Sequence, residues 1–506
     1  RYFCNQTTRA PTLVSHRQLN DQLQRHLYMY RVMLSTCADS KILTVNNMNP
    51  GMVKSKYIMR GPIQQRTMEL QHELEKGAKK PFKSVIKATI GDVQALGQKP
   101  VTFIRQVIAG VTYPPLIEKC IFPEDVVKRV REILEDCQGN TVGAYSPSSG
   151  LPYIRQHVAE YIKKRDGHCC RIENVVLTNG AALPLKQILQ LFINDIDGKP
   201  TGVMVPVPSS PIFTAFITEH HLTHVDYYLD EKKNWGLDIE ELQRAFEEAK
   251  KKGVNVRLLV VLNPGNPTAS VLTEANIELL AKFAKKHSLF ILADEVYQHN
   301  IFEPCTPFIS IKKVLMAMGS PFSEMELVSV MSSSKGYMGE CGLRGGWMEV
   351  FNLDAGVLEH IHKCNSTLNA APAKPPQPGE PSYDLWKKET GAILDSYKER
   401  AEFIYNSYKE IEGIHCNEIK GAFFSYPIID IPPKAFDAAK KNKQSPDFLY
   451  ARQLLEETGV AVLPGTEFGQ RPCTYHIRTN LPPMDQLKDM MERIKIFHTK
   501  FLKENC

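Results

Sequence analysis

The sequence lacks the features that mark several classes of protein. It has no internal repeat, and no apolar run near the roughly 20 residues that a membrane-spanning helix needs. Its 62 basic and 56 acidic residues give a net charge of only +6, without the basic stripe typical of nucleic-acid binding. We therefore expect no membrane and no nucleic-acid partner. A hydrophobic content of 43% with 23% charged residues indicates an ordinary globular protein.

The twelve cysteines also lack an organising pattern. None belongs to a C-x-x-C pair, and none pairs with a histidine at the spacing of a zinc site. We expect free thiols in a reducing compartment and no metal site.

Residues 1–40 differ in composition from the rest of the chain. They contain five arginines but only two acids, Asp21 and Asp39. This bias is typical of a mitochondrial transit peptide, which is basic and poor in acids, and it predicts the mitochondrial matrix. An ordinary solvated extension of a cytoplasmic protein has the same composition, so both interpretations stay open.

Residues 125–365 alternate between short apolar runs and helical patterns. This alternation predicts an α/β fold with a mostly parallel sheet covered by helices. Ligands of such sheets bind at the carboxyl ends of the strands. The apolar runs that we predict as strands are Val175–Thr178, Val203–Val207, Leu258–Leu262, Leu289–Ala293 and Leu327–Met331.

A proline-rich break at Leu368–Pro381 cannot continue a helix or a strand. Beyond it we predict a smaller α+β domain with a long helix at Tyr383–Ile411 and a closing amphipathic helix at Met484–Leu502. The predicted divisions are the extension 1–40, an N-terminal segment 41–124 that joins the small domain, the large domain 125–365, and the connection with the C-terminal small domain 366–506.

One lysine, Lys335, stands directly after a predicted strand and among small residues. Burial near cationic groups lowers the pKa of a lysine amine and makes it nucleophilic. Ser332 and Arg344 flank this lysine, and a hydroxyl with a guanidinium can hold a phosphate by charge-assisted hydrogen bonds. The segment is therefore consistent with a reactive amine beside an anion site, although taken alone the pattern favours a solvated surface lysine.

Polar groups also follow other predicted strands. Asp294 and Tyr297 come after Leu289–Ala293, where a carboxylate can keep a pyridine nitrogen protonated, although a helix N-cap also explains the aspartate. Asn266 lies in a turn that its Asn-Pro and Pro-Gly dipeptides explain equally well. The turn at Gly180 leads into a helix, and backbone N–H groups at a helix start bind anions.

Several segments together resemble one enzyme family. The segments include NPGNPT, LADEVYQ, SKGYMGECG and FGQRPCTYHIR. They are similar to the alanine aminotransferases, which are pyridoxal-phosphate enzymes of fold type I, and the likeness runs from about Lys41 to the C-terminus. The resemblance implies pyridoxal 5'-phosphate as cofactor, a small amino acid and a 2-oxo acid as substrates, and a homodimer.

The resemblance also implies roles at matching positions. Lys335 matches the lysine that forms a Schiff base with the cofactor and later moves the α-proton. Asp294 matches the partner of the pyridine nitrogen, and Asn266 and Tyr297 match the groups on the ring hydroxyl. The implied catalytic residues are Lys335, Asp294 and Tyr297.

Further matches concern the phosphate and the substrate. Arg478 matches the arginine that grips the substrate α-carboxylate, and Gly91 matches a glycine in the segment that closes over the substrate. Tyr145 matches a tyrosine that reaches the phosphate of the neighbouring subunit. The implied phosphate cradle comprises Ser332, Arg344 and the backbone amides of Gly180, Ala181 and Ala182.

Some residues depart from the family pattern. Ser210 stands where the family has an aromatic residue stacked on the cofactor, and Phe213 is the nearest ring that could replace it. Ala182 lacks a serine hydroxyl expected at the phosphate. The stretch 365–381 is shorter than in the family by roughly two to three helical turns.

The resemblance implies an aminotransferase that exchanges the amino group of L-alanine with 2-oxoglutarate, giving pyruvate and L-glutamate. Two alternatives stay open. A pyridoxal-phosphate lyase on the same fold would use the same Lys335, Asp294 and Arg478. A catalytically impaired paralogue would account for Ser210 and Ala182.

Overall fold

The structure is a computed structural model that describes residues 42–54, 61–89, 91–119, 121–303, 306–365 and 375–505. The chain divides into two units, residues 1–54 and 55–506. The described part of the first unit contains one helix, α2 (Pro50–Lys54). The basic extension 1–40 and part of the proline-rich break lie outside the described residues.

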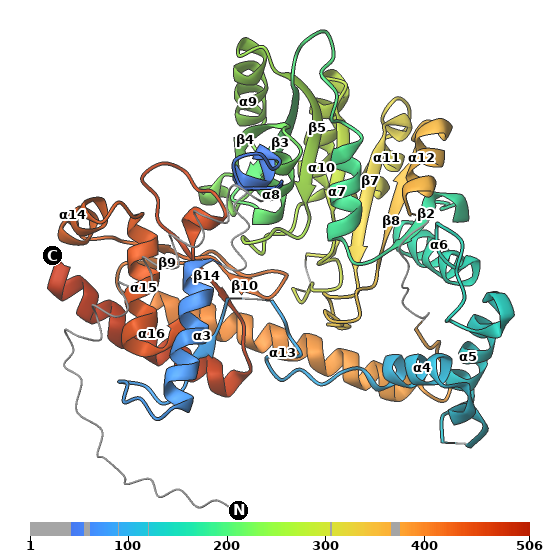
Figure 1. Ribbon diagram of the computed structural model, residues 1–506, viewed down its shortest axis with the longest axis horizontal. Helices are drawn as coiled ribbons and strands as arrows, with labels where there is room; N and C mark the ends of the chain where they lie inside the picture. The colour runs from blue at the N-terminus through green and yellow to red at the C-terminus, as the bar shows by residue number, and fades with distance from the viewer. Residues whose placement is uncertain are drawn as a thin grey trace, which may run out of the picture. The chain divides into compact units, whose positions relative to one another are not determined.

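A seven-stranded sheet forms the centre of the second unit (Figure 1). Its strands are β2 (Val175–Thr178), β3 (Thr201–Val207), β4 (Thr223–Tyr228), β5 (Asn255–Leu262), β6 (Phe290–Asp294), β7 (Leu327–Ser332) and β8 (Gly346–Phe351). They lie in the order β2-β8-β7-β6-β5-β3-β4. All neighbours from β7 to β4 are parallel, and β8 is antiparallel to β2 and β7. The predicted mostly parallel sheet is confirmed.

Helices cover both faces of this sheet. Alternate strand side chains pack on one face against α7 and α8, and on the other against α9, α10 and α11. Burial on both faces explains why these strands are continuous apolar runs in the sequence. The covering helices are α7 (Ala182–Gln190), α8 (Pro211–Glu219), α9 (Ile239–Lys251), α10 (Glu274–Lys286) and α11 (Ile311–Met318).

Local sequence signals explain where three of these helices begin. The side chains of Asp238, Thr273 and Ser310 each accept a hydrogen bond from a backbone N–H in the first turn of α9, α10 and α11, respectively. The other α-helices of the described second unit are α3 (Pro62–Glu75), α4 (Thr102–Thr112), α5 (Glu124–Asp136), α6 (Pro152–Asp166), α12 (Ala355–Asn365), α13 (Tyr383–Lys409), α14 (Pro433–Lys441), α15 (Pro446–Thr458) and α16 (Met484–Asn505).

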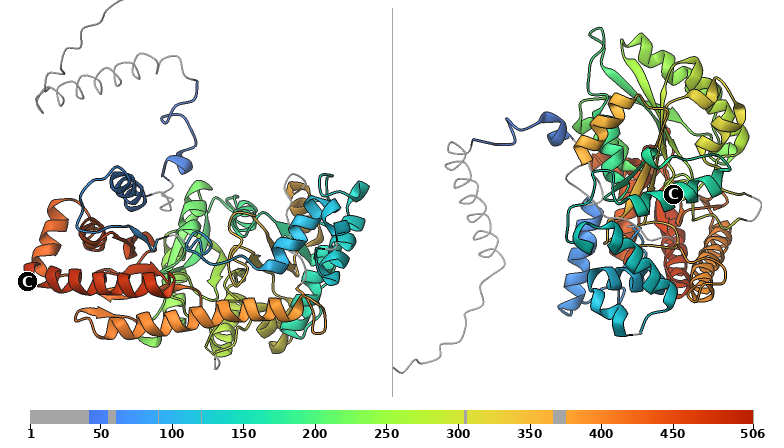
Figure 2. Two further views of the ribbon diagram at one scale, coloured as in Figure 1. Left: turned by 90° about the horizontal axis from the view of Figure 1, so that it is seen from below. Right: turned by 90° about the vertical axis from the view of Figure 1, so that its right-hand side faces the viewer.

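Small sheets and long helices make up the C-terminal part. The short strands are β1 (Ile86–Lys87), β9 (Ile414–His415), β10 (Phe424–Ser425), β11 (Ile428–Ile429), β12 (Val460–Ala461), β13 (Leu463–Pro464) and β14 (Ile477–Asn480). β10, β14 and β13 form an antiparallel sheet, and the long helices α13 and α16 lie side by side (Figure 2). β1 pairs in parallel with β12, so the N-terminal segment joins this part of the chain.

The strands and helices predicted from the sequence are present with small shifts in their ends. The predicted long helix becomes α13, which ends at Lys409, and the closing helix becomes α16. Two strands of the large sheet were not predicted. β4 lies at the edge of the sheet and is only half-buried, so it lacks a continuous apolar run, and β8 begins inside a glycine-rich segment.

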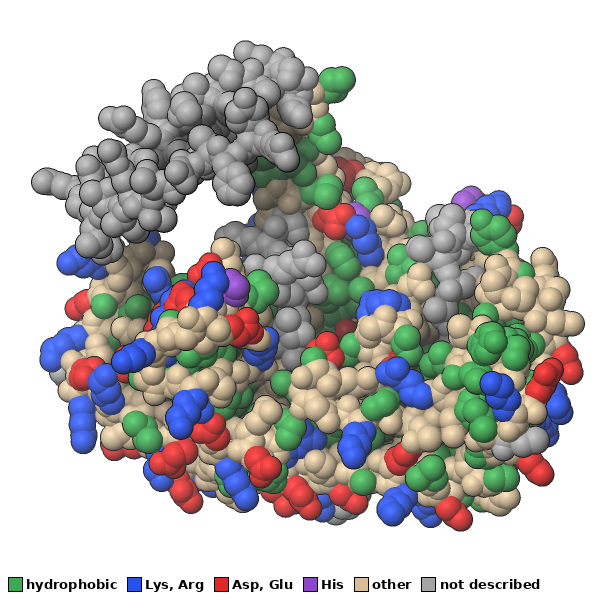
Figure 3. Space-filling view, turned by 60° about the horizontal axis from the view of Figure 1, so that its bottom comes forward, with side chains coloured by type: hydrophobic (Ala, Val, Ile, Leu, Met, Phe, Trp, Pro, Cys, Tyr) green, Lys and Arg blue, Asp and Glu red, His purple; other side chains and the backbone are tan. Residues whose placement is uncertain are grey.

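Charged side chains of both signs are interspersed over the face drawn in Figure 3. Within the described ranges, no helix combines the length and the apolar character that crossing a membrane requires. The described residues also contain no group of three or more His, Cys, Asp or Glu side chains placed to hold a metal ion.

A buried ion pair joins one covering helix to the sheet. Lys312 in α11 donates a hydrogen bond to Glu349 in β8, and the two side chains are only 1% and 3% exposed. Lys312 Nζ also donates to the backbone oxygen of Cys169 at 3.2 Å. Each ion stabilises the other in the interior, because a single buried ion would lose its hydration and gain no opposite charge in exchange.

We therefore predict that Lys312→Ala strongly destabilises the fold. Removing the cation leaves Glu349 buried and unpaired, at a cost of about 3–5 kcal/mol. Replacing both partners with apolar residues, Lys312→Met with Glu349→Leu, should restore most of that stability. The readout is the midpoint of thermal unfolding.

The exposed pair of Lys282 and Glu278, at 3.2 Å, offers a matched control. Lys282→Ala should change stability by no more than about 0.5 kcal/mol. If Lys312→Ala shifted the unfolding midpoint as little as Lys282→Ala does, the buried pair would not be a major contribution to the stability of the fold.

Candidate active site

Strand register brings the predicted site residues to one edge of the sheet. Asp294 ends β6 and pairs with Leu262 at the end of β5 and with Val330 near the end of β7. Asn266 and Lys335 therefore follow strands whose carboxyl ends lie beside Asp294. This edge is where ligands of parallel sheets bind.

Lys335 is partly buried between the end of the sheet and the C-terminal part. Its Nζ donates a hydrogen bond to the backbone oxygen of Gly91 at 3.2 Å, and it lies 5.3 Å from the ring centre of Phe423. Burial lowers the pKa of this amine, and the charge of Arg478 lowers it further, whereas Asp294 raises it. An amine of lowered pKa is a better nucleophile at neutral pH.

Asp294 is a buried carboxyl with a weak local partner. Its Oδ1 accepts a hydrogen bond from the backbone N–H of Val296 at a donor–acceptor distance of 3.4 Å. Burial raises its pKa to about 6, although the Val296 amide and the charge of Lys335 act in the opposite direction. A cation placed against this carboxyl would stabilise its ionised form.

Arg478 in β14 brings a buried guanidinium to the same site. Its Nη1 donates to Oδ1 of Asn266 at 3.1 Å, and its Nη2 donates to the backbone oxygen of Thr89. The guanidinium carbon lies 4.3 Å from the ring centre of Phe424 and 4.7 Å from that of Phe468. Burial lowers its pKa to about 10. These contacts fix the plane of the guanidinium before any substrate arrives.

Tyr297 closes one side of the site. Its ring packs edge-on against Phe423 and Phe424, with ring centres 5.6 and 5.7 Å away. Lys335 Nζ lies 5.8 Å from the centre of the tyrosine ring. Burial raises the pKa of the Tyr297 hydroxyl, so the phenol stays protonated and can donate a hydrogen bond.

Two glycines allow close approach in and beside this site. A Cβ on Gly91 would lie 2.5 Å from a ring carbon of Phe423 and 3.4 Å from Lys335 Nζ. Gly180 has φ of +73°, and a Cβ there would lie 2.8 Å from the guanidinium of Arg344. A side chain at either position would displace a group of the site.

A second cluster of donors lies next to the lysine. Ser332 pairs with Gly346, which also pairs with Thr178, so β7, β8 and β2 bring Ser332 close to Gly180. Arg344 Nη2 donates to the backbone oxygen of Asn179 at 3.4 Å. The first turn of α7 begins at Ala182, and Ala181 provides no side-chain cap for its N–H groups. Such N–H groups and a nearby guanidinium form an anion site.

Two predicted residues stand apart from these clusters. Tyr145 is 92% exposed, as a residue that acts on another subunit would be, and its role stays a prediction. Ser210 precedes α8 and makes no side-chain cap to it. Phe213 is fully buried in the core beneath the sheet, so it does not take the place of a stacking ring over the site.

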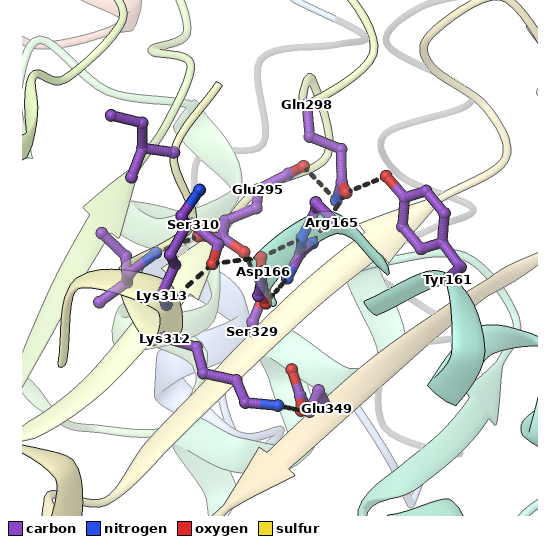
Figure 4. Close-up of polar contacts among 12 residues, drawn as sticks. Tyr161, Arg165, Asp166, Glu295, Gln298, Ser310, Lys312, Lys313, Ser329 and Glu349 are labelled. Atoms are coloured by element: carbon purple, nitrogen blue, oxygen red, sulfur yellow. Dashed lines mark hydrogen bonds and ion pairs between the residues drawn. The ribbon is translucent and has the colours of Figure 1, made fainter. Parts of the chain in front are cut away.

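A buried polar network beside Asp294 was not predicted (Figure 4). Glu295 accepts hydrogen bonds from Ser329 Oγ and from the backbone N–H of Ile311, the latter at 2.9 Å. Burial raises the pKa of Glu295 to about 7, while the charge of Arg165 lowers it. Glu295 therefore ties the end of β6 to β7 and α11.

The same network continues into α6. Arg165 forms an ion pair with Asp166 at 2.7 Å and donates to Gln298 Oε1 at 2.8 Å. Ser310 Oγ donates to Asp166 at 2.8 Å. The only sequence signal for this framework was the second acid beside Asp294, because its other members are distant along the chain.

Asn300 is a further residue that the sequence did not point to. It is fully buried, and its Oδ1 accepts a hydrogen bond from the backbone N–H of Gly336 at 2.8 Å. Its own N–H donates to the backbone oxygen of Tyr297. Asn300 thus ties the residue after Lys335 to the turn after Asp294.

The fold and the lysine-centred site define a class of enzyme. Residues 118–494 match the family model described as aminotransferase class I and II. This match covers well over half of the chain. The protein therefore belongs to the class I and II aminotransferases, and its fold is that of fold type I.

The protein is similar to several alanine aminotransferases. Alanine aminotransferase 2 of Xenopus laevis is 46% identical over 482 residues, which cover 93% of this chain and 89% of that protein. Alanine aminotransferase 1 of Homo sapiens is 44% identical over 478 residues, covering 92% and 96%, respectively. The resemblance inferred from the sequence is confirmed.

Solved structures share the fold at lower identity. An alanine aminotransferase from Pyrococcus furiosus superposes with a TM-score of 0.66 at 20% identity, over 89% of this chain and 99% of that one. At this identity the likeness concerns the fold alone.

The raised pKa of Asp294 predicts a stability difference between the protein without a bound ligand and its Asp294→Asn variant. A carboxyl with a raised pKa in the folded state favours folding below pH 4, and this contribution is lost as the pH rises through about 6. Asp294→Asn removes the buried charge and keeps the acceptor for Val296. The variant should therefore be more stable than the parent at pH 8, by about 3 kcal/mol at most.

Thermal unfolding of both proteins at pH 5 and pH 8 measures this effect. The gap between the two unfolding midpoints should widen toward pH 8. An unfolding midpoint for Asp294→Asn at or below that of the parent at pH 8 would contradict the account of Asp294 as a strained, buried anion.

Proposed function

We propose that this protein is an alanine aminotransferase, which moves the amino group between L-alanine and 2-oxoglutarate with pyridoxal 5'-phosphate as its cofactor. Pyruvate and L-glutamate are the products. The observation that carries the proposal is that Lys335 lies close enough to Asp294 and Arg478 for both charges to shift the pKa of its amine. The names of the relatives in Xenopus laevis and Homo sapiens support alanine as the amino acid substrate.

The residues present fit pyridoxal phosphate. Lys335 offers an amine of lowered pKa for the covalent bond to the cofactor. Asp294 is a carboxyl whose pKa is raised by burial, and the protonated pyridine nitrogen is the cation that would offset it. Gly180 leaves a cradle beside Arg344 that a Cβ would fill. We assign the ring hydroxyl to Asn266 and Tyr297, and the phosphate to Ser332, Arg344 and the amides of Gly180, Ala181 and Ala182.

The cofactor, when bound, supplies an electron sink for the pair of electrons left at the substrate Cα after its proton is removed. Lys335 Nζ is the base that would take this proton and return it, and its lowered pKa favours the unprotonated amine that this role needs. Asp294 would be kept ionised by the positive charge of the ring nitrogen. Tyr297 would donate a hydrogen bond to the ring hydroxyl, because its raised pKa keeps the phenol protonated.

Arg478 orients the substrate. A guanidinium binds a carboxylate through two parallel hydrogen bonds, so it fixes both the position and the plane of the α-carboxylate. Asn266 and the stacking rings of Phe424 and Phe468 hold the guanidinium in one plane beforehand. This orientation would direct the Cα–H bond toward the amine of Lys335. Holding the bond in this geometry raises the rate, because the entropy cost of orienting the substrate is met on binding. Gly91 lets the covering segment lie against Lys335.

The lyase alternative uses the same residues and differs in its products. A lyase releases ammonia from its substrate, whereas an aminotransferase transfers the nitrogen to the oxo acid. The impaired-paralogue alternative rests on Ser210 and Ala182, which remove one stacking ring and one hydroxyl from the cofactor site. The intact set of Lys335, Asp294 and Arg478 favours activity.

A homodimer and a mitochondrial location complete the proposal. Tyr145 and Val142 are exposed beside an apolar cavity of about 400 Å³ that α4 and α5 line, which is a surface suited to a second copy of the chain. In that arrangement Tyr145 would reach the phosphate of the neighbouring subunit. The basic composition of residues 1–40 supports the mitochondrial matrix over the cytoplasm.

Ser210→Tyr should tighten the binding of pyridoxal phosphate. An aromatic ring over the cofactor adds about 0.5–1.5 kcal/mol beyond the apolar area that it buries. We expect a dissociation constant lower by about tenfold, within a factor of several. Ser210 makes no side-chain cap to α8, so its replacement loses no such bond. Titration of cofactor-free protein with pyridoxal phosphate gives both constants.

Ser320→Tyr is the control, because it adds the same ring at an exposed serine outside the site. Its dissociation constant should equal that of the parent. Equal constants for the parent and Ser210→Tyr would mean that residue 210 does not lie over the cofactor ring.

Lys335→Ala should abolish covalent attachment of the cofactor and all transamination. Borohydride reduction of the loaded parent, followed by denaturation and mass measurement, should show one cofactor fixed to the peptide that contains Lys335. The variant should show none, because no amine remains at that position to form the bond. Lys313→Ala, which removes an exposed lysine, should behave like the parent. A cofactor fixed to another lysine in the parent would overturn the assignment.

A further inference from the structure

Glu467 is a carboxyl in the active-site wall that the proposed reaction does not use. It ends a short 3₁₀ turn, Gly465–Glu467, which follows β13 directly. Its Oε2 is buried without a hydrogen-bond partner, and within the described part of the chain Glu467 forms no ion pair. A buried carboxyl oxygen without a donor is costly, so its position needs an explanation.

The turn brings Glu467 close to Arg478. Leu463 in β13 pairs with Arg478 in β14, and the ring of Phe468, the residue after Glu467, lies 4.7 Å from the guanidinium carbon. The charges of Glu467 and Arg478 act on each other, since each one shifts the pKa of the other toward its ionised form. The guanidinium also has a free donor, because Arg478 Nε is buried without a partner in the described residues.

The turn is held in place from two sides. Asp447 in α15 is fully buried, and its Oδ2 accepts hydrogen bonds from the backbone N–H of Thr466 at 2.7 Å and from Gln470 Nε2 at 3.0 Å. The backbone oxygen of Phe468 accepts a hydrogen bond from the N–H of Ser209 at 2.9 Å. The turn therefore cannot swing away from Arg478 without breaking these bonds.

Burial, with smaller and opposite contributions from two neighbouring charges, makes Glu467 titrate close to pH 8. Burial raises its pKa to about 8, the charge of Arg478 lowers it, and the charge of Asp447 raises it. The other titratable groups coupled to Arg478 are the amine of Lys335, whose pKa burial and Arg478 lower, and the hydroxyls of Tyr297 and Tyr426, which burial keeps protonated. Glu467 is thus a carboxyl of this wall that changes charge between pH 7 and pH 9.

We propose that Glu467 is a positioning residue that controls carboxylate binding at Arg478 through its own charge. When Glu467 is neutral, the positive charge of Arg478 is available to an incoming carboxylate. When Glu467 is ionised, its carboxylate competes with that anion for the same guanidinium. This inference rests on the proposed role of Arg478 as the group that binds the substrate α-carboxylate.

The coupling is reciprocal. A carboxylate bound at Arg478 disfavours a second negative charge nearby, so it raises the pKa of Glu467. Ionised Glu467 in turn weakens the binding of the carboxylate. The same coupling free energy accounts for both effects. Substrate binding above pH 8 should therefore take up a proton. The enzyme would bind amino and oxo acids more tightly on the acid side of pH 8.

Propionate is a suitable probe, because it carries the carboxylate of alanine but no amino group and cannot be transaminated. Its dissociation constant from the cofactor-loaded protein is measured by calorimetry at pH 7 and pH 9. If only the neutral form of Glu467 permits binding, the parent should lose about tenfold in affinity across this range, as expected for a pKa of about 8. Glu467→Gln should lose little, because its amide cannot ionise.

Glu410→Gln is the matched control, since it alters an exposed glutamate, and it should lose affinity as the parent does. Glu467→Ala serves as a second variant if the amide disturbs the turn, and it should also lose little. An equal loss in the parent and both Glu467 variants, or no loss in the parent, would overturn the inference. Absence of propionate binding at pH 7 would overturn it as well.

The test separates this inference from the proposed function. If the protein bound propionate with the predicted pH dependence but did not transaminate L-alanine, the role of Glu467 would stand and the reaction would be wrong. In steady-state assays of an active enzyme, the KM of the parent for L-alanine should rise from pH 7 to pH 9 more than the KM of Glu467→Gln does. The kcat of the parent divided by the kcat of Glu467→Gln should be the same at both pH values.

Discussion

Burial of three charged groups in one place is the constraint on which the rest of the site depends. Asp294 and Arg478 are buried and Lys335 is partly buried, and desolvation moves the pKa of each toward its neutral form. Such groups persist only where the surrounding fold holds them rigidly. The same desolvation makes the lysine nucleophilic and strengthens every electrostatic interaction with a ligand.

The rigidity comes from polar frameworks inside the large domain as well as from its apolar core. Glu295 links β6 to β7 and α11, and the Lys312–Glu349 pair links α11 to β8. The first framework involves β6 and β7, which lead to Asp294 and Lys335, and the second involves β8, which pairs with β7. Because buried charged groups tolerate little displacement, these bonds fix the register that brings Asp294 beside Lys335.

The sequence was informative where strands are buried on both faces. Continuous apolar runs marked β5, β6 and β7, and the polar residues that follow them, Asn266, Asp294 and Lys335, meet because parallel strands end at one edge. The edge strand β4 escaped prediction because only part of it is buried.

Contacts between distant segments could not be predicted in this way. Glu467 reaches the site through a turn that β13 and β14 hold, and nothing in its local sequence signals a neighbouring arginine. Asn300 and the partners of Glu295 are likewise defined by tertiary packing. The sequence alone showed that Ser210 departs from the family pattern. The structure was needed to show that Phe213 lies in the core and therefore does not replace the missing ring.

The half-reaction with L-alanine tests the central claim most directly. The purified protein is loaded with pyridoxal phosphate, freed of excess cofactor and mixed with L-alanine in the absence of any oxo acid, and pyruvate and ammonia are then measured. The account predicts one equivalent of pyruvate per chain, no ammonia, and a second equivalent only after 2-oxoglutarate is added. Continuous formation of pyruvate with ammonia, or no pyruvate at all, would contradict it.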